Sequence, residues 1–169
     1  MTNDKFQISN KLEDSNAQTP NPKIILASDH AGFQLKKVLL DYLRKKIDVT
    51  DFGTFSEEVV DYPDYGFPVG EKVASGEFEH GILICGSGLG MSIVANKVKG
   101  IRAALCTSVE IAKLSRQHND ANILVLPGRF MDEDLAKNIV EVWISTDFED
   151  GRHQRRLDKI QKFEEKRMK

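Results

Sequence analysis

Short apolar runs alternate with longer segments of helical periodicity along most of the chain. Each run is bounded by glycine or polar residues, as is typical of buried strands, whereas the segments between them repeat apolar residues at near-helical spacing. The predicted strands span residues 23–28, 47–52, 81–85, 101–105 and 122–126. The predicted helices span residues 33–46, 68–75, 91–98, 109–117 and 132–144, and residues 61–65 carry turn chemistry around a proline.

This alternation of strands and helices predicts an α/β protein. The expected architecture is a three-layer, Rossmann-like fold with a five-stranded, mostly parallel sheet and helices on both faces. Ligands bind such sheets at the carboxyl ends of the strands. Polar residues that directly follow an apolar run are therefore the first candidates for a functional site.

The two ends of the chain fall outside the alternation. Residues 1–22 are rich in Asn, Gln, Ser, Asp and Pro and are predicted to be a disordered extension of the α/β domain at 23–150. Residues 151–169 are basic and predicted to be helical, with Leu157, Ile160 and Phe163 on one stripe. We expect this tail to be part of the same domain and to pack on a neighbouring subunit, although its composition fits a solvated tail equally well.

Charge and composition exclude several classes of partner. The formal net charge of −2 provides no general attraction to nucleic acid, and no apolar run approaches the roughly 20 residues of a membrane span. The first 22 residues also lack the pattern of a secretory signal. Cys85 and Cys106 each end an apolar run, which favours two free thiols in a reducing cytoplasm.

The segment ICGSGLGM, residues 84–91, carries the strongest chemical signal. Cys85 ends a predicted strand and precedes a glycine loop whose N–H groups can hold a negative charge. Met91 stands where the dinucleotide fingerprint needs glycine and where a C-x5-R thiol phosphatase needs arginine, and the Gly-Lys-Ser/Thr of a phosphate loop is absent. We interpret Cys85 as a general base, with a buried structural cysteine beside a tight turn as the alternative.

Other polar pairs have both a functional and an ordinary interpretation. Asp29-His30 follows the first strand and fits either a site or a helix cap, while Arg129 follows the last strand. His118-Asn119 fits either a site or an ordinary helix end. Arg152 and Arg156 are one helical turn apart and fit either an anion clamp or a solvated face. The Asp and His residues lack a compact metal-ligand spacing, so we predict no metal.

Five motifs in order resemble the ribose 5-phosphate isomerase B family, which also contains galactose 6-phosphate and allose 6-phosphate isomerases. They are SDHAGFQLK (28–36), DYPDYG (61–66), ICGSGLGMSIVANK (84–97), LSRQHNDAN (114–122) and GRHQRR (151–156). The resemblance covers the chain from about residue 23 onward. It implies cofactor-free interconversion of ribose 5-phosphate and ribulose 5-phosphate through an enediolate, in the non-oxidative pentose phosphate pathway.

The resemblance also implies a role for each matched residue. Cys85 would be the base, Ser87 would help to move a proton between the substrate oxygens, and His118 would open the sugar ring. The implied substrate-binding residues are Asp29, His30, Tyr62, Gly86, Gly88, Leu89, Gly90, Asn119, Arg129, Arg152 and Arg156. In the family several of these come from the partner subunit, so we expect a homodimer or a dimer of dimers.

Two alternatives stay open at this point. The same chemistry on galactose 6-phosphate or allose 6-phosphate is the nearest, because the residues do not fix the length of the sugar. A phosphosugar-binding module without catalysis is the alternative from another class. The presence of both Cys85 and His118 speaks against it, because binding alone requires neither.

Overall fold

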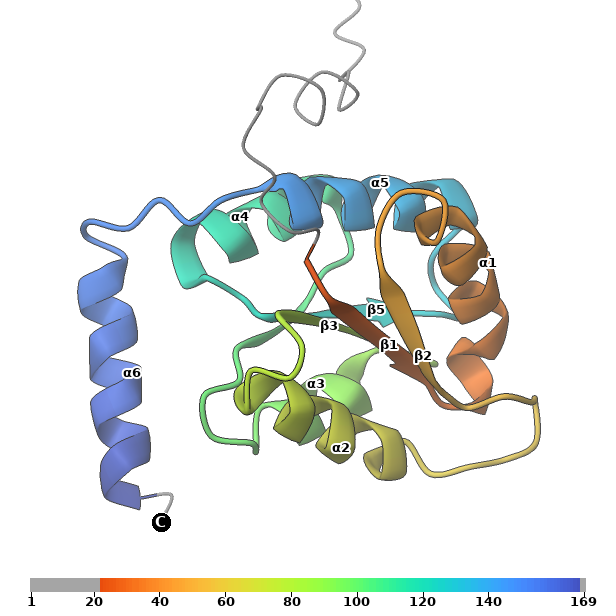
Figure 1. The fold of residues 1–169 in the computed structure, drawn as a ribbon, viewed down its shortest axis with the longest axis horizontal. Coiled ribbons are helices and arrows are strands. Elements are labelled where there is room, and N and C mark those ends of the chain that lie inside the picture. Colours follow the sequence, from red (N-terminus) through yellow and green to blue (C-terminus); the bar gives the residue numbers. More distant parts are fainter. Residues whose placement is uncertain (1–21, 168–169) are drawn as a thin grey trace, which may run out of the picture.

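The computed structural model describes residues 22–167 and has three layers, with a five-stranded parallel sheet in the middle (Figure 1). The strand order is β2-β1-β3-β5-β4, and every neighbouring pair is parallel. The strands are β1 (Ile24–Ser28), β2 (Val49–Gly53), β3 (His80–Cys85), β4 (Ala103–Leu105) and β5 (Ile123–Pro127). This confirms the predicted fold class, whereas the predicted extension at 1–22 lies almost entirely outside the described residues.

Helices cover both faces of the sheet. The elements are the short 3-10 helix η2 (His30–Gly32), α1 (Phe33–Leu43), α2 (Pro63–Ala74), α3 (Leu89–Ala95), α4 (Val109–Asn119), α5 (Glu133–Ser145) and α6 (Gln154–Arg167). Helices α1, α4 and α5 lie on one face, and α2 and α3 lie on the other (Figure 1). Helix α6 extends along one side of the body.

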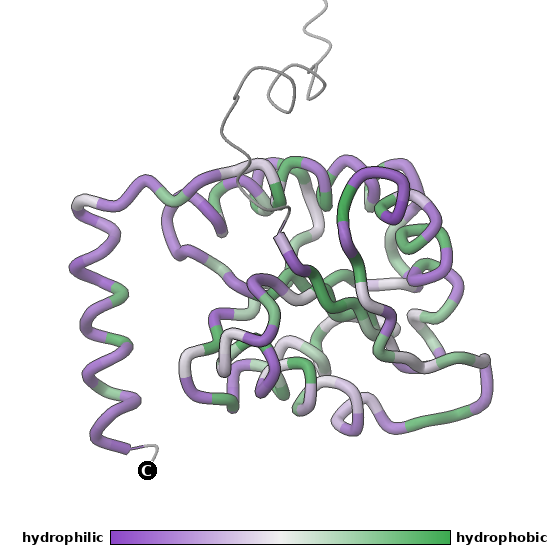
Figure 2. Tube along the Cα trace, viewed as in Figure 1, coloured by the Kyte–Doolittle hydropathy of each residue, from purple (hydrophilic) through white to green (hydrophobic). Residues whose placement is uncertain are grey.

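The central strands are buried on both faces, so successive side chains enter two separate cores. In β1, Ile24 and Leu26 face the helices α1, α4 and α5, whereas Ile25 and Ala27 face α2 and α3. Figure 2 shows β1 as a mostly hydrophobic stretch in the middle of the fold. Each fully buried Ile or Leu side chain contributes about 1.5–3 kcal/mol of burial free energy. This packing holds in place the strand ends that carry the polar candidates.

The prediction for residues 61–75 was wrong at its start. We predicted a turn around Pro63 and a helix from residue 68, but α2 begins at Pro63 and has Pro68 in its interior. Pro63 occupies the first helical position, where its fixed φ suits the helix and its missing N–H is not needed. Proline therefore marks the beginning of a helix here, and this places Tyr62 at the helix N-cap.

Helix α6 leaves most of its apolar stripe uncovered. Leu157 is buried, but Ile160 is 48% exposed and Phe163 is 62% exposed. Figure 2 shows this helix as mainly hydrophilic, with a few hydrophobic positions along it. Among residues 22–167, no helix has the length and apolarity required to cross a membrane.

Candidate active site

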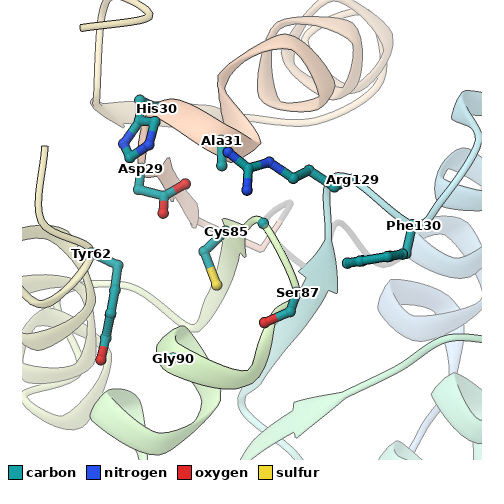
Figure 3. A pocket seen from close by; sticks show the side chains of 10 residues that line it. Asp29, His30, Ala31, Tyr62, Cys85, Ser87, Gly90, Arg129 and Phe130 are labelled. Atoms are coloured by element: carbon teal, nitrogen blue, oxygen red, sulfur yellow. The ribbon is translucent and has the colours of Figure 1, made fainter. Parts of the chain in front are cut away.

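A pocket of about 310 Å³ opens at the carboxyl ends of β1, β3 and β5 (Figure 3). Its size is at the small end of the range for ligand pockets, which suits a small metabolite. The lining residues are Asp29, His30, Ala31, Tyr62, Cys85, Gly86, Ser87, Gly90, Arg129 and Phe130. Eight of these ten are sequence-predicted site residues, and they come from four separate segments of the chain.

Cys85 is held at the base of the pocket by backbone hydrogen bonds to the residues that follow the neighbouring strand, β5. The Gly128 N–H donates to the Cys85 carbonyl at 2.8 Å, and the Arg129 N–H donates to the Gly86 carbonyl at 3.0 Å. These bonds continue the β3–β5 ladder into the loop. Cys85 is only 4% exposed, and its sulfur points into the pocket between Asp29 and Ser87 (Figure 3). The thiol is therefore fixed in position and largely shielded from water.

The glycine loop has a shape that side chains would destroy. Gly88 has φ +76°, and a Cβ there would lie 2.4 Å from Leu105 Cδ1. At Gly90 a Cβ would lie 2.9 Å from the ring of Tyr62, so this ring packs directly on the loop. Ser87 Oγ accepts from the Leu89 N–H at 3.3 Å and so helps to shape the loop.

Gly88 and Leu89 belong to this loop but do not line the pocket. The helix that follows, α3, has only 7 residues. The loop's own N–H groups, rather than a long helix dipole, are therefore the donors available to a bound anion.

Asp29 and His30 combine the ordinary and the functional interpretation. Asp29 caps η2, because its Oδ1 accepts from the Gly32 N–H at 3.0 Å, and its carboxylate also lines the pocket (Figure 3). The Nδ1 atom of His30 contacts the backbone of Val60, at 3.1 Å from the carbonyl oxygen and 3.2 Å from the nitrogen. This contact orients the ring and leaves its other nitrogen for a ligand.

Arg129 brings a positive charge over the pocket (Figure 3). A guanidinium at this position matches the geometry of a phosphate group. Ala31 and Phe130 also line the pocket and were not predicted. Phe130 is 77% exposed, and no feature of the sequence distinguishes it from an ordinary surface residue.

The remaining predicted residues form a second group, away from this pocket. His118 and Asn119 end α4, and Arg152 and Arg156 lie at the start of the tail. In a parallel sheet with helical crossovers, a helix that leaves the carboxyl end of a strand runs back to the opposite edge. The end of α4 and the tail accordingly lie across the molecule from the carboxyl ends of β1 and β2 (Figure 1). One copy of the chain therefore does not bring its two groups of predicted site residues together.

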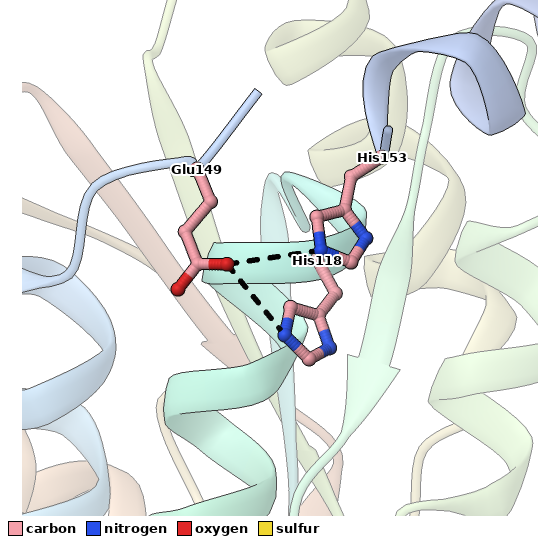
Figure 4. A group of neighbouring side chains, drawn as sticks. All are labelled: His118, Glu149 and His153. Atoms are coloured by element: carbon pink, nitrogen blue, oxygen red, sulfur yellow. Dashed lines mark ion pairs between the residues drawn. The ribbon is translucent and has the colours of Figure 1, made fainter. Parts of the chain in front are cut away.

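His118 stacks on His153, which belongs to the GRHQRR motif. The ring centroids are 4.2 Å apart and the rings are within 10° of parallel. The Oε2 atom of Glu149 lies 3.8 Å from His118 Nε2 and 3.7 Å from His153 Nε2 (Figure 4). Burial lowers the pKa of His153, and the charges of His118, Arg152 and Arg156 lower it further, against the opposing effect of Glu149.

These three side chains have ligand atoms within 4.8 Å of one another, so their compactness, unlike their sequence spacing, is compatible with a metal. The orientation of the two histidine rings, however, does not suit a shared metal ion. An imidazole binds Zn²⁺ along the in-plane lone pair, at about 2.0–2.1 Å. Two nearly parallel rings cannot both direct their lone pairs at one ion. The group in this arrangement fits shared protons better than a shared metal.

The second cysteine, Cys106, does not line the pocket. Cys106 is fully buried, and burial raises the pKa of its thiol to about 11 despite a contact with Ser115. A thiol that ionises with such difficulty is unsuited to proton transfer at neutral pH. Cys106 is therefore a packing residue.

Comparisons with known proteins agree with this geometry. The family model described as Ribose/Galactose Isomerase matches residues 24–160. Ribose-5-phosphate isomerase B of Escherichia coli K12 is 47% identical over 146 residues, covering 86% of this chain and 98% of the relative.

Two solved structures are also similar. Ribose-5-phosphate isomerase B of Clostridium thermocellum has a TM-score of 0.84 and 53% identity, over 85% of this chain and 98% of that one. The Mycoplasma genitalium enzyme with bound ribulose-5-phosphate has a TM-score of 0.81 and 44% identity, over 85% and 96% of the two chains. The family match and these similarities establish that the chain belongs to the ribose/galactose isomerase family.

Proposed function

We propose that this chain interconverts ribose 5-phosphate and ribulose 5-phosphate through an enediolate. The observation that carries the proposal is the position of Cys85, whose shielded thiol faces one pocket together with the glycine loop and Arg129. The pocket thus offers a base, N–H donors for an oxyanion and a cation for a phosphate. Relatives that cover nearly all of the chain's α/β domain are named ribose-5-phosphate isomerase B.

The proposed carbon chemistry takes place at the base of the pocket. The thiolate of Cys85 removes the proton from C2 of the open-chain aldose, the electrons move into the C1 carbonyl, and the loop N–H groups stabilise the enediolate. In other enzymes one such donor contributes about 10²–10³ in rate. Ser87 moves a proton between O1 and O2, and the proton on Cys85 is returned to C1. Asp29 binds sugar hydroxyls, and His30 and Arg129 approach the phosphate.

Two copies of the chain are needed to complete this site. We propose that His118, Asn119, Arg152 and Arg156 of one subunit face the Cys85 pocket of its partner, in a homodimer or a dimer of dimers. The distance between the two groups across one chain supports this arrangement (Figure 1). The uncovered stripe of α6 supports it too, because Ile160 and Phe163 are exposed in one chain and would be buried against a second subunit.

The six-carbon alternative concerns the same site. Galactose 6-phosphate or allose 6-phosphate would need room for one more carbon, and the pentose is favoured by relatives that are named ribose-5-phosphate isomerase B, one of them with bound ribulose-5-phosphate. The non-catalytic alternative has no feature in its favour, since a buried thiol beside oxyanion donors has no use in binding alone.

We place the enzyme in the cytoplasm, a proposal supported by its two unpaired cysteines.

Proton NMR of ribose 5-phosphate incubated with the protein in D₂O and EDTA tests the activity. The proposal predicts ribulose 5-phosphate as the product. Deuterium at C1 of this ketose would show that the enediolate exchanges with solvent. Folded protein that converts a six-carbon aldose phosphate but leaves ribose 5-phosphate unchanged would contradict the proposed substrate. Inactivity on every aldose phosphate would contradict the proposed reaction.

A further inference from the structure

The group His118, Glu149 and His153 contains two residues with no role in the mechanism above. Glu149 lies on the connection between α5 and α6, and its backbone N–H donates to the Gln117 carbonyl at 3.0 Å. This bond fixes the connection against the end of α4. His153 lies four residues after Glu149 and is buried, so its ring forms a fixed surface for His118.

The surroundings of His153 disfavour its protonated form. Arg152 Nε lies 3.4 Å from its Nε2 atom, and Arg156 Nη1 lies 3.5 Å from its Nδ1 atom. Burial and these positive charges lower its pKa, and a charged His118 stacked at 4.2 Å acts in the same direction. The negative charge of Glu149 is therefore available mainly to His118.

The carboxylate also selects between the two neutral forms of His118. It lies on the Nε2 side of the ring, so the form with hydrogen on Nε2 is favoured (Figure 4). The lone pair then resides on Nδ1, the nitrogen on the other side of the ring. A ring-opening base needs such a lone pair, because it must take the proton from the O1 hydroxyl of the furanose.

We propose that Glu149 and His153 are positioning residues that hold His118 in the tautomer and orientation required for ring opening in the partner's pocket. This inference rests on the proposed function. The step is balanced: Nδ1 takes the O1 proton, the C1–O4 bond breaks as the carbonyl forms, and the same proton passes to O4. The imidazole ends the step neutral and in the form in which it began.

Measuring the reaction in both directions separates ring opening, the step in which Glu149 and His153 would act, from the carbon chemistry at Cys85. Ribose 5-phosphate exists mainly as a furanose and must be opened before Cys85 can act. Ribulose 5-phosphate cannot form that ring, because its O5 carries the phosphate, so it reaches the enediolate without ring opening. A single turnover with enzyme in excess, stopped by rapid quench, therefore measures different steps from the two sides.

The test compares Glu149→Gln with the wild-type protein in both directions. Glu149 is half-exposed, and the variant keeps the shape of the side chain. We expect the single turnover from ribose 5-phosphate to slow about 10-fold or more, which is a fraction of what acid–base catalysis contributes. The turnover from ribulose 5-phosphate should stay within about twofold of the wild-type rate. His118→Asn should show the same split, and so should His153→Ala if it folds.

The matched control is Glu110→Gln, which removes a carboxylate at the other end of α4 and should change neither rate. Equal slowing from both sides, or no slowing from the ribose side, would overturn the inference. So would a His118→Asn variant that opens the ring normally. Wild-type protein that is inactive from both sides would instead refute the proposed function.

Discussion

Acid should destabilise this protein in part through the buried histidine His80. His80 begins the central strand β3, at the end of the strand opposite the pocket, and is 8% exposed. Its ring packs edge-on against Trp143, with centroids 5.1 Å apart, and its Nδ1 atom has no hydrogen-bond partner among the described residues. Burial lowers the pKa of this imidazole to about 4, and the charge of Arg116 adds to the effect while that of Asp120 opposes it.

The sign and size follow from linkage. Above the unfolded pKa of 6.5 the ring is neutral in both states, so the stability is fully present. Between pH 6.5 and about 4 the unfolded chain takes up a proton that the folded chain refuses, so stability falls with pH. A gap from 6.5 to about 4, at about 1.36 kcal/mol per pKa unit, amounts to about 3 kcal/mol.

The assay is urea unfolding of the wild-type protein and His80→Phe at pH 7.5, 6.5, 5.5 and 4.5, at one protein concentration. Phe keeps an aromatic ring against Trp143 but does not titrate. Other groups contribute to both proteins, so the difference between the two pH profiles isolates His80. We expect the wild-type protein to lose about 2–3 kcal/mol more than the variant over this range. Parallel profiles would refute the assignment of a buried, neutral His80.

Three further predictions concern the site and the core. Cys85→Ala should abolish isomerisation while calorimetry still detects binding of ribose 5-phosphate; substantial turnover would refute the role of Cys85 as base. Arg152→Ala should mainly raise KM through a lost phosphate contact, whereas the control Arg155→Ala, at an exposed position in the first turn of α6, should not; an unchanged KM would remove Arg152 from the clamp. Asp51→Ala should destabilise the fold by about 3 kcal/mol, because it leaves the ammonium of Lys36, which is 1% exposed, buried and unpaired. Urea unfolding measures this loss, and a change below about 1 kcal/mol would show that the pair is not buried in solution.

The pocket could be predicted because its chemistry lies at strand ends. Asp29, Cys85 and Arg129 each lie at or just after the end of an apolar run, and in a parallel sheet such residues converge at one edge. The helix boundaries were less predictable. Proline supports both a turn and a first helical residue, and tertiary packing decides between them, as the start of α2 at Pro63 shows.

The surroundings of His118 could not be predicted from sequence patterns. Glu149 lies on an irregular connection and resembles any exposed glutamate, so only the fold places it between His118 and His153. Similarly, Phe130 enters the pocket from a loop with no periodic signal. The separation of His118 from Cys85 across one chain also depends on the direction of α4 relative to the sheet, which no single motif encodes.

Subunit mixing tests the central claim, a site built from two copies of one isomerase, most directly. Cys85→Ala and His118→Asn should each be nearly inactive on ribose 5-phosphate. In a mixed dimer, however, one site combines the intact Cys85 of one subunit with the intact His118 of the other. Random association at equal amounts should therefore restore about a quarter of the wild-type activity. Two different tags on the two variants would confirm that mixed dimers form. If they form and activity does not return, each chain uses its own His118 or none, and the proposal of a shared site is wrong.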